Sequence, residues 1–142
     1  MLSVTLRWAG GTLMVGTDSG GHSVTIGHSP DDPSQFIGMK PSDLLLLAAS
    51  SCSTYDVVNI LKKQREPLQD IKVICSGEQL PDPPYTFTRI HIHYMVYGSV
   101  NPEKLERAIH LAEDKYCSVI STLRCGTPVT SDYEIIEPEV SR

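Results

Sequence analysis

Two of the four cysteines in this sequence, Cys52 and Cys117, lie in apolar segments with the spacing of helices. The thiolate of cysteine is a nucleophile, and it takes part in redox chemistry when its surroundings lower its pKa. A free cysteine among apolar residues is also very often an unreactive, buried side chain. The residues alone leave both interpretations open. No C-x-x-C pair is present, and Cys75 and Cys125 are expected to be inert.

The other candidate groups for chemistry are weaker. His91 and His93 lie two residues apart on one face of an expected strand, a spacing compatible with two metal ligands. No further histidine or acid lies close in sequence, so a polar strand face is favoured and no metal is expected. The acids Asp43, Asp56 and Glu113 form no recognisable acid and base pair. Neither a phosphate-binding glycine loop nor a G-x-S-x-G motif occurs.

The composition excludes some classes of partner. The formal net charge is −5 and no run of Lys and Arg occurs, which argues against nucleic-acid binding. No segment reaches the roughly 18 continuous apolar residues that a membrane helix requires. The first residues lack a basic start followed by an apolar run, so no signal peptide is predicted. We therefore expect a cytoplasmic protein of one domain, residues 1–142, with its cysteines reduced.

The element that must position Cys52 is an expected helix over residues 41–65. Pro41 suits the first turn, and Pro67 prevents continuation. The run from Leu44 to Ala49 is apolar on every side. Such a helix is buried all round, either in a core or at an interface with another subunit. Its length, about 36 Å at 1.5 Å per residue, favours the second interpretation.

The remaining elements follow from periodicity and turn residues. Strands are expected within residues 2–27, a β-hairpin over 71–98 and a last strand over 131–136. A helical segment over 102–125 begins after Asn101 and carries Cys117. This order predicts an α+β fold, with helices packed on a largely antiparallel sheet.

Both cysteine contexts resemble the OsmC/Ohr family, the osmotically inducible and organic-hydroperoxide-resistance proteins. The segment GMKPSDLLLLAASSCSTYDVVNIL, residues 38–61, is similar to the helix with the family's first cysteine. The segment EDKYCSVISTL, residues 113–123, is similar to the part with the second. Gly20, Gly21 and His22 and the strand RIHIHYMVYG also fit, so the resemblance covers nearly the whole chain.

The resemblance implies antiparallel sheets wrapped around long central helices in an intertwined homodimer. It also implies thiol-dependent reduction of peroxides without a metal or an organic cofactor. Cys52 would attack the peroxide and become a sulfenic acid, and Cys117 would resolve it as a disulfide. An external dithiol would restore both thiols.

The first turn of the helix departs from the family pattern. Typical members carry a glutamate ten residues before the first cysteine and an N-terminal arginine that it holds. Here Ser42 stands at that position with Asp43 beside it, and Arg7 is the only arginine in the first 60 residues. The departure keeps an alternative open, a non-catalytic dimer that binds a small molecule or acts in stress.

Five further side chains complete the candidate site. His22 is the candidate cation for Cys52, or else a turn histidine in solvent. Asp56, one helical turn after Cys52, would raise the pKa of the thiol unless it orients a histidine. Tyr55 and Tyr116 are candidates to line a peroxide pocket, with core packing as the alternative. Ser42 and Asp43 stay in the set as the residues in the glutamate's place.

Overall fold

The structure is a computed structural model that describes residues 1–28, 31–32, 34 and 37–139. The chain divides into two compact units, Met1–Leu45 and Leu46–Arg142. Each unit is described by itself below, and the expectation of a single domain stays a prediction.

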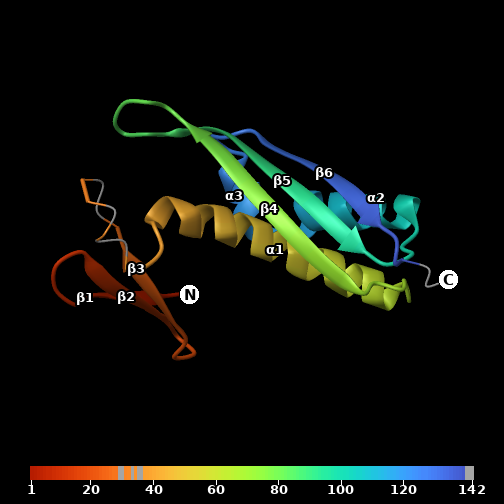
Figure 1. The fold of residues 1–142 in the computed structure, drawn as a ribbon, viewed down its shortest axis with the longest axis horizontal. Helices are drawn as coiled ribbons and strands as arrows, with labels where there is room; N and C mark the ends of the chain where they lie inside the picture. The colour runs from red at the N-terminus through yellow and green to blue at the C-terminus, as the bar shows by residue number, and fades with distance from the viewer. Residues whose placement is uncertain (29–30, 33, 35–36, 140–142) are drawn as a thin grey trace. The chain divides into compact units, whose positions relative to one another are not determined.

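The N-terminal unit contains a three-stranded antiparallel sheet. Its strands are β1 (Val4–Trp8), β2 (Leu13–Asp18) and β3 (Ser23–Gly27), paired in the order β1-β2-β3 (Figure 1). The strands predicted over residues 2–27 are therefore present. Gly10 and Gly21 adopt positive φ angles of 99° and 87° in the two turns, where other residues are strained.

The C-terminal unit is built on a second sheet in the order β4-β5-β6. Its strands are β4 (Asp70–Gln79), β5 (Phe87–Tyr97) and β6 (Val129–Ile136). The first two form the predicted antiparallel hairpin. The third pairs with β5 in parallel, which departs from the antiparallel expectation. The reason is that a helical segment connects β5 to β6 and returns the chain to the end of the sheet at which β5 begins, as parallel strands require.

Helix α1 (Pro41–Lys63) carries Cys52 and ends two residues before the predicted position. Arg65 adopts a positive φ of 55°, which interrupts the helical backbone just before Pro67. In this single chain only one side of α1 is buried, and the expectation that another subunit covers the other side stays a prediction. Ala49, Val57 and Leu61 are fully buried, whereas the Leu47 side of the helix is half exposed.

By length and composition alone α1 could cross a membrane, since it contains an 18-residue window of mean hydropathy 1.5. Only 28% of that window is buried. Core helices of globular proteins meet the same criterion, and the buried side of α1 does contribute to the core.

The segment between β5 and β6 is helical but not continuous. It consists of α2 (Pro102–Leu111), a π-helical turn η2 (Ala112–Tyr116) and α3 (Ser118–Leu123). Cys117 between them has an extended backbone, with φ −75° and ψ 105°. The prediction of one helical segment over 102–125 is corrected accordingly. Cys117 lies at the N-terminal cap of a short helix and not inside a long one.

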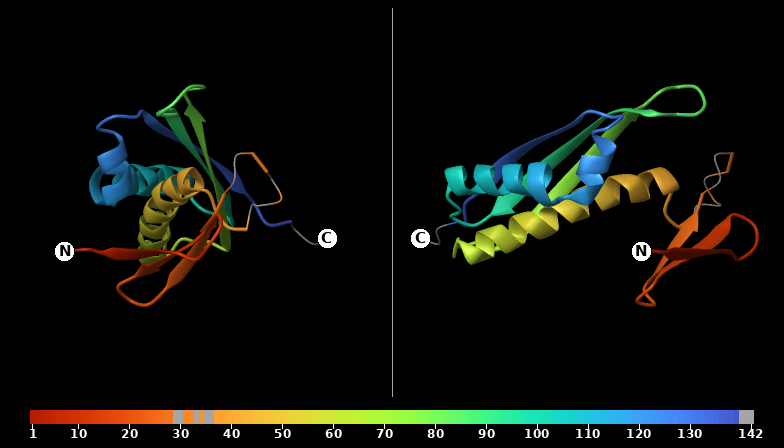
Figure 2. Two further views of the ribbon diagram at one scale, coloured as in Figure 1. Left: turned by 90° about the vertical axis from the view of Figure 1, so that its left-hand side faces the viewer. Right: turned by 180° about the vertical axis from the view of Figure 1, so that it is seen from behind.

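The core of this unit lies between one face of the sheet and the helices (Figure 2). Ile90, Ile92, Tyr94 and Val96 of β5 are fully buried on the face predicted from their alternation. Leu105 and Ala108 of α2 and Val57 of α1 are also fully buried and belong to the same cluster. This arrangement brings α1, with Cys52, close to the segment that carries Cys117.

Candidate functional site

Cys52 lies near the middle of α1 and is half-buried. Ser53, the next residue, is fully buried in the core, so this part of the helix faces the sheet. The thiol therefore lies at the border between the core and the exposed side of α1. A small molecule can reach such a position, whereas a fully buried thiol would require the helix to move.

Cys117 is only 2% exposed. Its Sγ accepts a hydrogen bond from the backbone N–H of Ile120 at 3.4 Å. Burial, together with a smaller contribution from the nearby side chain of Cys52, raises the pKa of Cys117 to about 11. The thiol of Cys117 is consequently protonated at neutral pH.

The proximity of the two thiols is the central feature of the site. Cys52 and Cys117 are far apart in the sequence, on separate elements, and both are free thiols in this structure. Neighbouring thiols can form a disulfide when their Cα atoms lie about 4.4–6.8 Å apart. The fold therefore presents a dithiol that could be oxidised to a disulfide. By contrast, burial raises the pKa of Cys75 to about 11, and none of the contacts described for it links it to another thiol.

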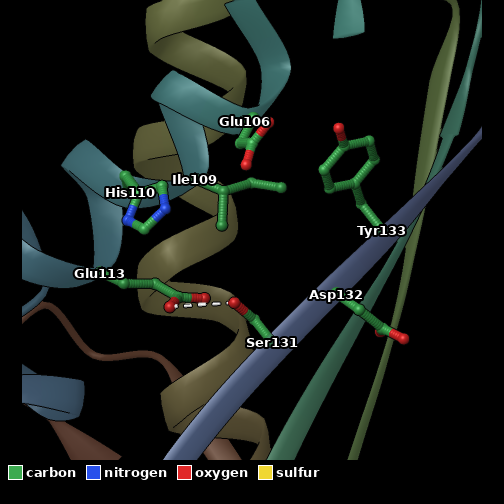
Figure 3. A pocket seen from close by; sticks show the side chains of 7 residues that line it. All are labelled: Glu106, Ile109, His110, Glu113, Ser131, Asp132 and Tyr133. Carbon is green, nitrogen blue, oxygen red and sulfur yellow. Dashed lines mark hydrogen bonds between the residues drawn. The ribbon is translucent and has the colours of Figure 1, made fainter. Parts of the chain in front are cut away.

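A buried carboxylate lies next to this dithiol, and the sequence did not reveal it. The side chain of Glu113, in η2, is 6% exposed. Its Oε2 accepts hydrogen bonds from Nη2 of Arg124 and from the hydroxyl of Ser131, each at 3.1 Å. Figure 3 shows Glu113 pointing towards Ser131 on β6, beside a cavity of about 300 Å³. The ion pair with Arg124 explains how a charge can be buried here.

Tyr94 connects Glu113 to the helix that carries Cys52. The Tyr94 hydroxyl donates to Oε1 of Glu113 at 3.1 Å and is also hydrogen-bonded to the hydroxyl of Ser53, with an oxygen–oxygen distance of 2.7 Å. Burial raises the pKa of Tyr94 well above its ordinary value, and the charges of Glu113 and Cys117 raise it further. The phenol is therefore a neutral donor, and its polar atom lies close to both cysteine-bearing segments.

The π-helical turn explains why sequence periodicity misplaced Tyr116. The backbone N–H of Cys117 donates to the carbonyl oxygen of Ala112, five residues earlier, at 2.8 Å. One residue more than in an α-helix is accommodated in this turn, so the following side chains are rotated around the axis. Tyr116, expected on the apolar face, is 53% exposed as a result, whereas Glu113 lies four residues after the buried Ile109 and is on the buried side by ordinary helical spacing. A faint signal existed, because two adjacent acids, Glu113 and Asp114, precede an arginine by about ten residues.

The other predicted site residues are placed as follows. Tyr55 is 76% exposed and Tyr116 is 53% exposed, so neither side chain packs in the core of the single chain. Tyr55 borders an open depression on α1 together with Thr54 and Val58. Asp56 and Ser42 are half-buried, and Asp43 is exposed in the first turn of α1. No contact described for these residues assigns them a role, so their place in the site stays a prediction.

His22 belongs to the N-terminal unit and is strongly exposed. Its Nδ1 lies 3.0 Å from Oδ2 of Asp18, and the other oxygen of this carboxylate, Oδ1, accepts from the backbone N–H groups of Gly20 and His22 at 2.8 Å. These hydrogen bonds, led by the one from the His22 backbone, lower the pKa of Asp18. The carboxylate holds the imidazole in one orientation. The role of His22 beside Cys52 stays a prediction.

His91 and His93 face away from the core and contact acids that are distant in the sequence. Asp132 of β6 lies 2.9 Å from Nε2 of His91 and 2.6 Å from Nδ1 of His93. Glu134 lies 3.2 Å from Nε2 of His93. Among the residues that the structure describes, no group of three or more histidines, cysteines or acids is arranged to hold a metal ion. The pair is therefore a polar ladder on the sheet.

Similar proteins share both sequence and fold with this chain. Protein YhfA of Escherichia coli is 30% identical over 136 residues, which cover 95% of this chain and 98% of that protein. The crystal structure of a hypothetical protein from Aquifex aeolicus is 31% identical, with a TM-score of 0.86 and 98% coverage of both chains.

The organic hydroperoxide resistance protein OhrB of Bacillus subtilis is more distant. It is 19% identical with a TM-score of 0.64, covering 94% of this chain and 98% of that one. At this identity the likeness concerns the fold, and it confirms the α+β architecture. The family model described as OsmC-like protein matches residues 30–132, well over half of the sequence. The chain belongs to the family of OsmC-like proteins.

Proposed function

We propose that this protein is a cysteine-based reductase of organic hydroperoxides, with Cys52 as the attacking residue and Cys117 as the resolving residue. The observation that carries the proposal is the proximity of these two thiols, inside a fold of the OsmC-like family. The name of the Bacillus subtilis neighbour, an organic hydroperoxide resistance protein, supports the choice of substrate class.

The reaction needs only sulfur as its redox centre. The sulfur of Cys52 attacks one peroxide oxygen, the O–O bond breaks, and the alcohol leaves with one proton. Cys52 is then a sulfenic acid, oxidised by two electrons. The sulfur of Cys117 attacks it, an S–S bond forms, the S–O bond breaks and water leaves. An external dithiol returns two electrons and two protons by thiol–disulfide exchange.

The surroundings of the two thiols support this division of roles. Cys117 is buried and its raised pKa keeps it protonated, so it presents little thiolate to a peroxide. Cys52 is the more exposed of the two. In the second step Cys117 loses its proton as its sulfur attacks a neighbour already in contact. We propose His22, held by Asp18, as the cation that favours the Cys52 thiolate.

We also propose that the protein is a homodimer in the cytoplasm. The exposed side of α1 carries Leu47 and Tyr55, which are 50% and 76% exposed. In the N-terminal sheet, Val4, Leu6 and Trp8 are between 58% and 80% exposed, and the sheet borders a depression of about 490 Å³. Apolar area of this extent is normally covered by a partner. Sedimentation equilibrium should give twice the chain mass, and a monomer at micromolar concentration would contradict this proposal.

The peroxidase proposal is tested by mass spectrometry. The reduced protein is treated with cumene hydroperoxide, alkylated and digested. We expect loss of two hydrogens and a crosslink between the peptides of Cys52 and Cys117. The Cys117→Ser variant should stop at a sulfenic acid that dimedone traps, and Cys52→Ser should not react. Cys125→Ser serves as the control and should behave like the natural protein.

The same experiment separates the proposal from its alternative. A non-catalytic protein that binds a small molecule would keep both thiols alkylatable after excess peroxide. That result would exclude the reductase.

A further inference from the structure

We infer that Tyr94 is a positioning residue, which holds the segment carrying Cys117 against Cys52 through hydrogen bonds to Ser53 and Glu113. The inference rests on the proposed pairing of Cys52 with Cys117. It gives Tyr94 a role that neither the motifs nor the similarity to other proteins assigns to it. The inference is tested by the equilibrium constant for formation of the Cys52–Cys117 disulfide.

The geometry places Tyr94 between the two cysteine-bearing segments. One partner of its hydroxyl, Ser53 at 2.7 Å, directly follows Cys52 in α1. The other partner, Glu113 at 3.1 Å, lies four residues before Cys117 in η2. Tyr94 itself is fully buried on β5, the central strand of the sheet. A rigid strand therefore links the two segments through one phenol oxygen.

The far end of this link is fixed on both sides of Cys117. Glu113 precedes the cysteine and Arg124 follows it, and the two are joined by an ion pair of 3.1 Å. Nη1 of Arg124 also lies 2.6 Å from Oδ1 of Asp114. Ser131 of β6 donates to the same Glu113 oxygen that Arg124 contacts. The short stretch around Cys117 is thus clamped to the sheet, and Tyr94 carries the connection to α1.

The backbone around Cys117 needs this support. Cys117 is the extended residue between a π-helical turn and a six-residue helix, so no continuous helix fixes its position. If the hydroxyl of Tyr94 is removed, Ser53 and Glu113 lose their shared partner. The Cys117 segment then becomes more mobile relative to α1, and the effective concentration of one sulfur near the other falls.

The experiment measures the stability of the disulfide without peroxide. The protein is equilibrated with mixtures of reduced and oxidised dithiothreitol and then quenched by alkylation. In this reaction the two thiols give two protons and two electrons to the oxidised reagent, which becomes the dithiol. We expect Tyr94→Phe to lower the equilibrium constant for the Cys52–Cys117 disulfide about tenfold, a rise in reduction potential of about 30 mV.

Two further variants make the result specific. Tyr133→Phe removes a hydroxyl of the same kind on β6, outside the network, and should leave the potential unchanged. Ser53→Ala removes the α1 end of the link, and it decides the matter if Tyr94→Phe does not fold. Ser53→Ala should also raise the reduction potential of the disulfide, as Tyr94→Phe does. If Tyr94 had only a structural role, its substitution would lower the thermal stability without changing the reduction potential of the disulfide.

Several outcomes would overturn the inference. These are an unchanged potential in Tyr94→Phe, an equal shift in Tyr133→Phe, or a natural protein that forms no Cys52–Cys117 disulfide in oxidised dithiothreitol. A protein that fails to react with hydroperoxide but shows the Tyr94 shift would refute the proposed function alone. The two claims are thereby tested separately.

Discussion

Replacing Glu113 by Gln should destabilise the protein clearly, although the two side chains have almost the same shape. Glu113 is 6% exposed and accepts hydrogen bonds from three side chains, Tyr94, Ser131 and Arg124. The amide can still accept on its oxygen side. On the other side its NH₂ group replaces an acceptor, and the negative charge opposite Arg124 is lost.

The size of the effect follows from these contacts. Removing one partner of a fully buried ion pair costs about 3–5 kcal/mol. The Arg124 side chain is 33% exposed and keeps Asp114 as a second partner, so solvent and that acid compensate in part. Hydrogen bonds to a charged group are worth about 1.5–3 kcal/mol, and their neutral counterparts about 1 kcal/mol. We expect Glu113→Gln to lower the free energy of unfolding by about 2 kcal/mol at neutral pH.

The assay is urea or thermal unfolding followed by far-ultraviolet circular dichroism. A loss of about 2 kcal/mol corresponds to a fall in Tm of about 4–8 °C for a chain of this size. Asp114→Asn is the matched control, because Asp114 also contacts Arg124 but is 57% exposed. Its effect should remain below about 1 kcal/mol. If Asp114→Asn destabilises as much as Glu113→Gln, burial of the Glu113 carboxylate is not the source of the stability.

Two further predictions concern the second sheet and its turns. The hydrogen bond to Asp132 is the main cause that raises the pKa of His93, so the stabilisation that protonated His93 provides is complete below about pH 6.5 and is lost as pH rises through the pKa of His93 in the folded protein. The difference in urea midpoint between the natural protein and His93→Gln should therefore shrink from mildly acidic to alkaline pH. A difference that stays constant with pH would contradict this prediction. Gly98 has a φ of 124°, and an added Cβ would lie 2.2 Å from the backbone oxygen of Pro67. Gly98→Ala should therefore lower the free energy of unfolding, measured by thermal unfolding, by at least about 1–3 kcal/mol. The control Gly126→Ala, where an added Cβ meets open space, should change it little.

The elements whose pattern is local were predictable from the sequence. The alternation in β5 gave the correct buried face, because a strand in contact with a core on one side must alternate. Pro41 and Pro67 bracketed α1 closely. The parallel pairing of β6 with β5 was not predictable in this way, since strand periodicity does not distinguish the two directions of pairing.

The candidate site was predictable only at its two sulfur atoms. Cys52 and Cys117 were visible from their contexts and from the resemblance to a family. Glu113 was set aside because it forms no recognisable acid and base pair in the sequence, and its partners Tyr94, Arg124 and Ser131 are distant from it along the chain. Asp132 is adjacent to His93 only across the sheet, so no local spacing could associate them.

The sequence by itself determined the α+β elements, the apolar central helix and the two candidate thiols, because these depend on side-chain type and short-range period. Only the tertiary structure decided that the thiols of Cys52 and Cys117 meet, and that Tyr94 and Glu113 connect their segments. The physical reason is that these contacts join residues from α1, β5 and η2. Their proximity depends on how the helices pack on the sheet and on one extra residue in a single helical turn.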